Sequence, residues 1–204
     1  RMTTAYMPKT TPLLSGDEYT MLMKEAYLNP NLDDNRGNIP EYNYVNDGSA
    51  FFWNYNNNTD WVSEITKTAF KHDHNVSLTG GGERANYRVS LGYLTESGIV
   101  TGQGYDRFST RVELGYKLSD RLRFTGEFAY TYSDNDKSYD DQILDLAMKK
   151  MPNIPVYARD RYGNYTDTYF NIDRATSNLH DSQKNMVNPV ALAELATYKT
   201  RTYQ

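Results

Sequence analysis

Long runs in which apolar and polar residues alternate constrain this chain more than any other feature of its sequence. Between residues 107 and 118, the even positions carry Phe108, Thr110, Val112, Leu114, Tyr116 and Leu118. The odd positions between them carry only polar residues or glycine. Runs of the same period lie at 74–80, 86–95 and 121–133. A period of two residues predicts β-strands with one apolar and one polar face.

The length of these runs and the position of their aromatic residues favour strands that cross a membrane. The runs are about ten residues long, the length of a tilted strand that spans a bilayer, whereas strands in soluble proteins usually have five or six residues. Aromatic side chains lie near the ends of the apolar rows, as in the aromatic girdles of outer-membrane barrels. Arginine and glutamate in the polar rows suit a water-filled lumen. We therefore predict an all-β fold, a partial antiparallel transmembrane β-barrel.

The connections between the runs alternate between short and long. Gly80–Arg84 and Ser119-Asp120 have the composition of tight turns, whereas residues 8–73 and 134–189 form two long segments. Outer-membrane barrels have short periplasmic turns and longer extracellular loops. This rule predicts about six strands and two outer loops, near 8–73 and 134–189. The strands are expected near residues 1–7, 74–80, 85–95, 107–118, 121–133 and 190–204. Both ends of the chain are expected to cut through strands of a larger barrel.

The two long segments also contain helix signals. Ser15-Gly-Asp-Glu18 is a capping-box sequence, and apolar residues follow it at helical spacing. A second helix is expected to start at Thr59-Asp60 and to continue through Trp61 and Ile65 to Ala69. A third is expected over residues 140–151, because Pro152 ends it. The outer loops are therefore expected to contain short helices.

Composition excludes some classes of protein and leaves one alternative open. The net charge is -4, which gives no basic surface for nucleic acid, and there is no cysteine for disulfide or thiolate chemistry. Aromatic residues reach 14% and include 19 tyrosines, a residue suited to surfaces that are apolar at one end and wet at the other. A soluble, tyrosine-rich β-sheet module that binds glycans is the alternative interpretation.

The residues that could hold a metal or catalyse a reaction have simpler interpretations. His72-Asp-His74 could ligate a metal if the segment is extended, but a polar start to a strand explains it better. Asp134–Asp141 and Asn31–Gly37 resemble calcium loops only loosely, and solvated acidic loops explain them. Gly80–Gly82 lacks the lysine of a phosphate-binding loop. No catalytic triad is present in the sequence, and a glycoside hydrolase remains a distant alternative. We predict no metal, no cofactor and no enzymatic activity.

Aromatic residues in the two long segments are the candidate binding residues. Exposed aromatic clusters favour interfaces, and aromatic faces can stack on sugars. We expect contacts with a ligand or with a lid protein at Trp53, Tyr55, Tyr157, Tyr162, Tyr165 and Tyr169.

Several segments resemble the SusC/RagA family of TonB-dependent outer-membrane transporters of Bacteroidota. They are Leu14–Tyr19, Thr59–Ile65, His74–Gly81, Asn86–Tyr93, Ser97-Gly98, Arg107–Ser109 and Asn188-Pro-Val-Ala191. The resemblance implies an importer in the cell outer membrane that takes up oligosaccharides or peptides together with a SusD-like surface lipoprotein. It also implies energy coupling through TonB and contact with outer-membrane lipid. Nothing in this sequence resembles the plug domain, the TonB box or most of the barrel of that family, so we expect an early barrel segment.

Overall fold

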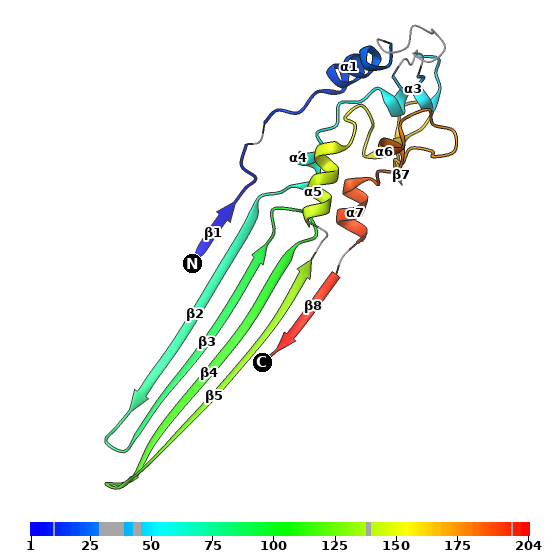
Figure 1. Cartoon of the computed structure of the whole chain (residues 1–204). Helices are drawn as coiled ribbons and strands as arrows, with labels where there is room; N and C mark the ends of the chain where they lie inside the picture. Colours follow the sequence, from blue (N-terminus) through cyan, green and yellow to red (C-terminus); the bar gives the residue numbers. More distant parts are fainter. Residues whose placement is uncertain (10, 29–38, 43–45, 138–139, 197) are drawn as a thin grey trace. The chain divides into compact units, whose positions relative to one another are not determined.

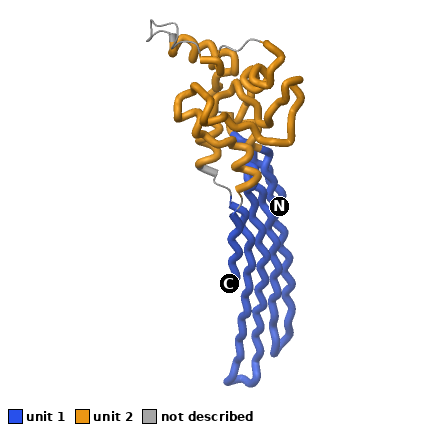
Figure 2. Tube along the Cα trace, turned by 90° about the vertical axis from the view of Figure 1, so that its right-hand side faces the viewer, with its two compact units in different colours: residues 1–7, 67–138, 197–204 blue, residues 8–66, 139–196 orange. Residues whose placement is uncertain are grey.

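The computed structural model describes residues 1–9, 11–28, 39–42, 46–137, 140–196 and 198–204. The chain forms two compact units (Figure 2). The first unit contains residues 1–7, 67–138 and 197–204, and the second contains residues 8–66 and 139–196. Each unit therefore combines segments that are distant in the sequence.

The first unit is a six-stranded antiparallel sheet in the order β1-β2-β3-β4-β5-β8. The strands are β1 (Met2–Ala5), β2 (Ala69–Gly81), β3 (Ala85–Ser97), β4 (Gly104–Ser119), β5 (Leu122–Lys137) and β8 (Tyr198–Tyr203). The β2–β3 and β4–β5 turns lie at the same end of the sheet (Figure 1). The prediction of a mostly antiparallel β-sheet is confirmed. The sheet is open and does not close on itself.

The register aligns the alternating residues of neighbouring strands into apolar and polar rows. Val89, Val112 and Phe128 are direct partners across β3, β4 and β5. One position earlier on β3, Arg88 is opposite Glu113, which is opposite Glu127 on β5. Because side chains alternate along a strand, the first row lies on one face and the second on the other.

The described residues of the first unit contain no second sheet that could cover its apolar face. Val76 and Phe128 on this face are 68% and 60% exposed. A soluble β-sandwich would bury such a face against a second sheet, so this arrangement argues against the soluble alternative. In the described residues, none of the helices combines the length and the apolar character that crossing a membrane requires.

Several elements differ from the predicted boundaries: β4 starts at Gly104, β5 continues to Lys137, and the helix expected to reach Ala69 ends at Ile65. The second strand starts at Ala69 instead of residue 74, because helix α4 (Trp61–Ile65) ends before Thr66, which has an extended backbone. The predicted strand at 190–204 was wrong in its first half. Residues Pro189–Leu195 form helix α7, and β8 begins only at Tyr198. Proline at the first helical turn after an asparagine cap explains the helix.

The second unit consists of short helices and one hairpin around an apolar core. Its helices are α1 (Gly16–Leu28), α3 (Ala50–Tyr55), α4, α5 (Asp140–Lys149), α6 (Asp181–Lys184) and α7, and its strands are β6 (Tyr157–Arg159) and β7 (Tyr165–Tyr169). Trp61, Ile143 and Ile154 are almost completely buried. The indole N–H of Trp61 donates to the carbonyl of Met151 at 2.9 Å, which joins the two long segments of the sequence.

The capping box predicted at Ser15 is present at the start of α1. The Glu18 carboxylate accepts hydrogen bonds from the Ser15 backbone N–H at 2.9 Å and from the Ser15 hydroxyl at 2.8 Å. These bonds hold the pKa of Glu18 below its usual value. The helix start is also fixed from outside, because the Gly16 N–H donates to Asn58 Oδ1 at 2.9 Å.

The same contact gives a prediction for Gly16→Ala. A Cβ atom at this position would lie 2.0 Å from the Asn57 carbonyl oxygen, so α1 or the Asn57 backbone must move. Overpacking of this kind typically costs about 1–3 kcal/mol. We expect faster amide hydrogen exchange over residues 16–28 in the full-length protein. Leu14→Ala, at an exposed position outside this contact, is the control.

Candidate functional site

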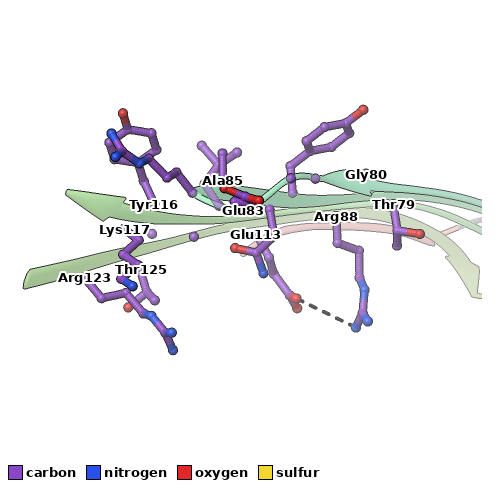
Figure 3. A pocket seen from close by; sticks show the side chains of 18 of the residues that line it. Thr79, Gly80, Glu83, Ala85, Arg88, Glu113, Tyr116, Lys117, Arg123 and Thr125 are labelled. Carbon is purple, nitrogen blue, oxygen red and sulfur yellow. Dashed lines mark ion pairs between the residues drawn. The ribbon is translucent and has the colours of Figure 1, made fainter. Parts of the chain in front are cut away.

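The turn end of the sheet shows how its two faces differ (Figure 3). Residues of the β2–β3 and β4–β5 hairpins line an open pocket there. Tyr116 lies on one side of the sheet, and Arg88, Glu113, Lys117 and Arg123 lie on the other (Figure 3). The residues that line this pocket come from both faces of the sheet, of which one carries Tyr116 and the other carries charged side chains.

Ion pairs connect three strands on the polar face. Arg88 lies 3.8 Å from Glu113, and Arg111 lies 3.0 Å from Glu113 and 2.5 Å from Glu127. These side chains are 37–61% exposed, and ion pairs in such surroundings contribute little to stability. Their main effect is to keep this face polar and hydrated between β3 and β5.

Two aromatic rows bound the apolar face. Tyr116 and Phe124 are partners near the turns, whereas Tyr93, Phe108 and Tyr132 are aligned in a second row. Tyr116 and Phe108 are eight positions apart on β4. At about 3.4 Å per residue, the two rows are separated by roughly 27 Å along the strand.

Charged residues return on the apolar face immediately beyond the second aromatic row. Asp106, Asp134 and Arg201 are aligned across β4, β5 and β8. Arg201 Nε lies 3.3 Å from an Asp134 carboxylate oxygen. The apolar stretch of this face therefore ends abruptly at a row of tyrosine and phenylalanine.

The residues that were weighed as metal ligands, and for which simpler interpretations were preferred, form other contacts. His72 and His74 lie on one face of β2 with parallel rings, whose centroids are 6.3 Å apart. Within the described ranges, no three histidine, cysteine or acidic residues form a group that could hold a metal ion. Asp134 pairs with Arg201, and Asp136 pairs with Lys199 at 3.1 Å. The Asn31–Gly37 segment lies outside the described residues.

The structure separates the candidate aromatic residues into packed and exposed ones. Tyr55 is buried, its ring forms a T-shaped contact with Phe170 at 5.7 Å, and burial raises its pKa. The Trp53 ring packs against Gly163. Neither aromatic side chain is fully free for a ligand, because each one packs within the second unit.

The four remaining tyrosines belong to the β6–β7 hairpin. The rings of Tyr157 and Tyr169 stack at 5.1 Å, and the Tyr169 hydroxyl donates to the Glu194 carboxylate, which raises the pKa of Tyr169. Tyr162 and Tyr165 are 70% and 63% exposed. Of the six predicted residues, these two are the most accessible.

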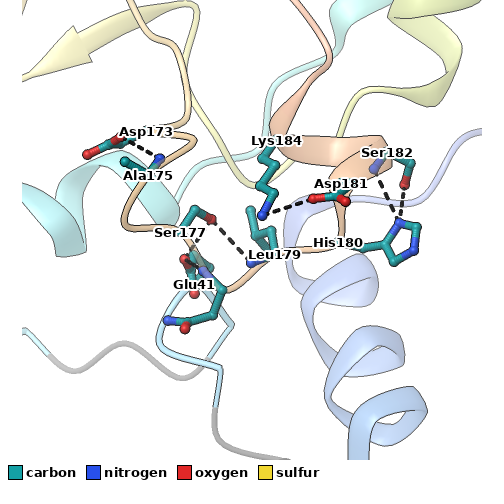
Figure 4. A network of polar contacts seen from close by, with 10 residues as sticks. Glu41, Asp173, Ala175, Ser177, Leu179, His180, Asp181, Ser182 and Lys184 are labelled. Atoms are coloured by element: carbon teal, nitrogen blue, oxygen red, sulfur yellow. Dashed lines mark hydrogen bonds and ion pairs between the residues drawn. The ribbon is translucent and has the colours of Figure 1, made fainter.

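A buried carboxylate that no sequence pattern singles out lies in the second unit (Figure 4). Glu41 is 2% exposed, and its Oε1 atom accepts from the Ser177 hydroxyl at 2.8 Å and from the Asn178 N–H at 2.9 Å. The Ser177 hydroxyl in turn accepts from the Leu179 N–H at 3.2 Å. Because these residues are more than a hundred positions apart, only the fold brings them together.

Buried Lys150 gives a prediction about pH. Its ammonium group donates to the Met186 carbonyl, and burial lowers its pKa from 10.5 to about 8. Between about pH 8 and 10.5 the unfolded chain therefore binds more protons than the folded chain, and stability rises with pH in this window. The gain is at most about 3 kcal/mol.

Lys150→Met removes this titration, so its stability should not rise over the same window. Urea midpoints of the full-length protein at pH 7.5 and 10, followed by hydrogen exchange of the α5 region, measure the difference. Lys149→Met is the matched control, because Lys149 is exposed and pairs with Asp145 at 2.7 Å. An equal rise in wild type and Lys150→Met would contradict the assignment.

Comparison with known proteins gives relatives of one kind. The chain is 32% identical over 183 residues to the TonB-dependent receptor SusC of Bacteroides thetaiotaomicron, which covers 89% of this chain and 16% of that protein. Two TonB-dependent receptors of Formosa agariphila are 29% and 26% identical, over 76% and 69% of this chain and 16% and 14% of their own lengths. No family model matches. The chain spans about one sixth of the curated relatives that it matches, and these relatives are receptors and not enzymes.

Proposed function

Since the chain belongs to the SusC-type TonB-dependent receptors, we propose that its sheet is an early arc of an outer-membrane import barrel. In this proposal the six strands form one part of the barrel wall, and the second unit, residues 8–66 and 139–196, forms two outer loops. The plug domain and the remaining strands belong to parts of the protein outside this chain.

One observation supports the membrane placement above all others. The apolar face is bounded by two aromatic rows, and charged residues follow directly beyond one of them. Lipid-facing surfaces of outer-membrane barrels have this order of apolar band, aromatic girdle and polar rim. The opposite face, with its arginine and glutamate pairs, would line the lumen.

Cysteine scanning tests this placement, and this part of the receptor contains no cysteine of its own that would react. In the full-length receptor, cysteines replacing Val112 and Phe128 should resist a water-soluble maleimide. Cysteines replacing Ser109 and Thr131, on the polar face, should react through the lumen. Equal labelling of both sets in intact cells would overturn the transmembrane assignment.

The proposed activity is uptake of oligosaccharides or peptides with a SusD-like surface lipoprotein, powered through TonB. The receptor names of the relatives support this class of activity. Growth of a receptor deletion strain on defined oligosaccharides and on peptides, with and without the restored gene, tests the solute. The loop aromatics are proposed as contacts for the solute or the lipoprotein, with Tyr162 and Tyr165 the most accessible.

A further inference from the structure

The β6–β7 hairpin has a turn that hydrogen bonds and packing hold in one conformation. The Asp160 carboxylate accepts from the backbone N–H groups of Tyr162 at 2.8 Å and Asn164 at 2.9 Å. Gly163 has a φ of 86°, which favours glycine, and a Cβ atom there would lie 2.9 Å from the Trp53 ring. The turn is therefore fixed by the hairpin and by helix α3.

A buried asparagine fastens the hairpin to the rest of the second unit. Asn54 is 7% exposed, and its amide donates to the Arg159 carbonyl at 2.8 Å while accepting from the Arg159 N–H at 2.7 Å. The side chain thus makes the paired bonds that a neighbouring strand would make. The side chains that project from the hairpin are consequently held on a rigid support.

Two arginine–tyrosine pairs project from this support. The Arg159 guanidinium lies 4.2 Å from the centre of the Tyr165 ring, and the Arg161 guanidinium lies 5.0 Å from that of Tyr162. Asp160 lies between the arginines in sequence, but its carboxylate is bound to the turn backbone. Because the tyrosines remain 63% and 70% exposed, their rings are accessible although each contacts an arginine.

The exposure of the two tyrosines favours a protein partner over a small solute. Sites for small molecules are concave and bury most of the ligand, whereas side chains this exposed stand out from the surface. Tyrosine and arginine are the residue types that dominate binding energy at protein interfaces, where they fill pockets on the partner. Arginine beside the ring favours pockets bordered by carboxylates, with which guanidinium pairs.

We propose that Tyr162 and Tyr165, with Arg161 and Arg159, anchor the surface lipoprotein by entering a pocket bordered by acidic residues. This inference rests on the proposed function, which supplies the lipoprotein as the partner. It assigns the contact to the lipoprotein and not to the imported solute. Preorganisation of the hairpin lowers the entropic cost of the contact.

The test measures the affinity of the full-length receptor for a SusD-like surface lipoprotein of the same organism. The double variant Tyr162→Ala/Tyr165→Ala should bind at least about 30-fold more weakly, the effect of a single 2 kcal/mol anchor. Arg161→Glu should also weaken binding, whereas Arg161→Lys should retain more of it. Thr168→Ala, on the same hairpin, is the matched control, because the Thr168 hydroxyl contacts only Thr166 within the described residues.

Unchanged lipoprotein affinity in the double variant would overturn the inference, and reduced solute binding with intact lipoprotein affinity would assign the tyrosines to the solute. Hydrogen exchange of residues 157–169 must match that of the wild type, and Arg161→Glu provides a second test if the double variant unfolds locally. Failure of the proposed function would be seen in a different experiment. The cysteines on the two faces of the sheet would then label equally, whatever the hairpin binds.

Discussion

Val112→Arg is expected to destabilise the full-length receptor in lipid vesicles by about 2–4 kcal/mol, measured as a lower free energy of unfolding. Val112 lies near the middle of the apolar face, between Val89 and Phe128 and four positions from each aromatic row on β4. In the proposed barrel, an arginine at that depth must lose its hydration or pull water into the bilayer. Reversible urea titration in vesicles measures the change.

Thr131→Arg is the matched control for this substitution. Thr131 lies on the polar face opposite Ser109, without a charged residue directly opposite it on β4. A lumen-facing arginine remains hydrated, so its effect should stay below about 1 kcal/mol. If the two arginines destabilise the receptor equally, the assignment of the two faces is wrong.

The strands of the sheet could be predicted because their environment is regular. Every second residue from Tyr87 to Tyr93 faces the same surroundings, and these surroundings select apolar side chains. The alternation of apolar and polar residues ends before the strand does, because backbone hydrogen bonding between strands does not depend on side-chain type. Ala69–Asp73 therefore belongs to β2, but its side chains do not alternate as those of the central strand do.

The second unit was harder to predict, because distant contacts decide its structure. The sequence pattern predicted Tyr55 and Tyr162 equally as binding residues. The ring of Tyr55 is buried beside Phe170, whereas the ring of Tyr162 is exposed. Local sequence cannot distinguish these outcomes, since Phe170 is more than a hundred positions from Tyr55. The buried Glu41 has the same cause, because its hydrogen-bond donors come from residues 177 and 178.

The segment Asn188-Pro-Val-Ala191 contained a signal that could have corrected the predicted strand. Asparagine followed by proline is a typical helix start, because asparagine caps free N–H groups and proline fits the first turn. In the structure Asn188 caps α7 by accepting from Val190 N at 3.0 Å and Ala191 N at 3.3 Å.

Asn188 also forms several hydrogen bonds from a buried position in the second unit, so we expect its substitutions to have large effects on stability. It is 1% exposed, and its amide donates to the carbonyls of Val156 at 2.8 Å and Phe170 at 3.1 Å. Asn188→Ala removes the helix cap and leaves the Phe170 carbonyl without this donor, whereas the Val156 carbonyl still accepts from the Phe170 N–H at 2.9 Å. Loss of a cap costs about 0.5–2 kcal/mol, and each unsatisfied buried group adds about 1–3 kcal/mol.

Asn188→Asp separates these contributions, because a carboxylate keeps the cap but cannot donate. It would also place a buried negative charge against the carbonyls of Val156 and Phe170, and an uncompensated buried charge costs about 3–5 kcal/mol. We therefore expect Asn188→Asp to destabilise the second unit at least as much as Asn188→Ala at pH 7, although it retains the better cap. Urea midpoints read by hydrogen exchange of residues 156–170 and 189–195 measure both variants. A nearly wild-type Asn188→Asp would show that the cap, and not the two donated bonds, is the main contribution of Asn188.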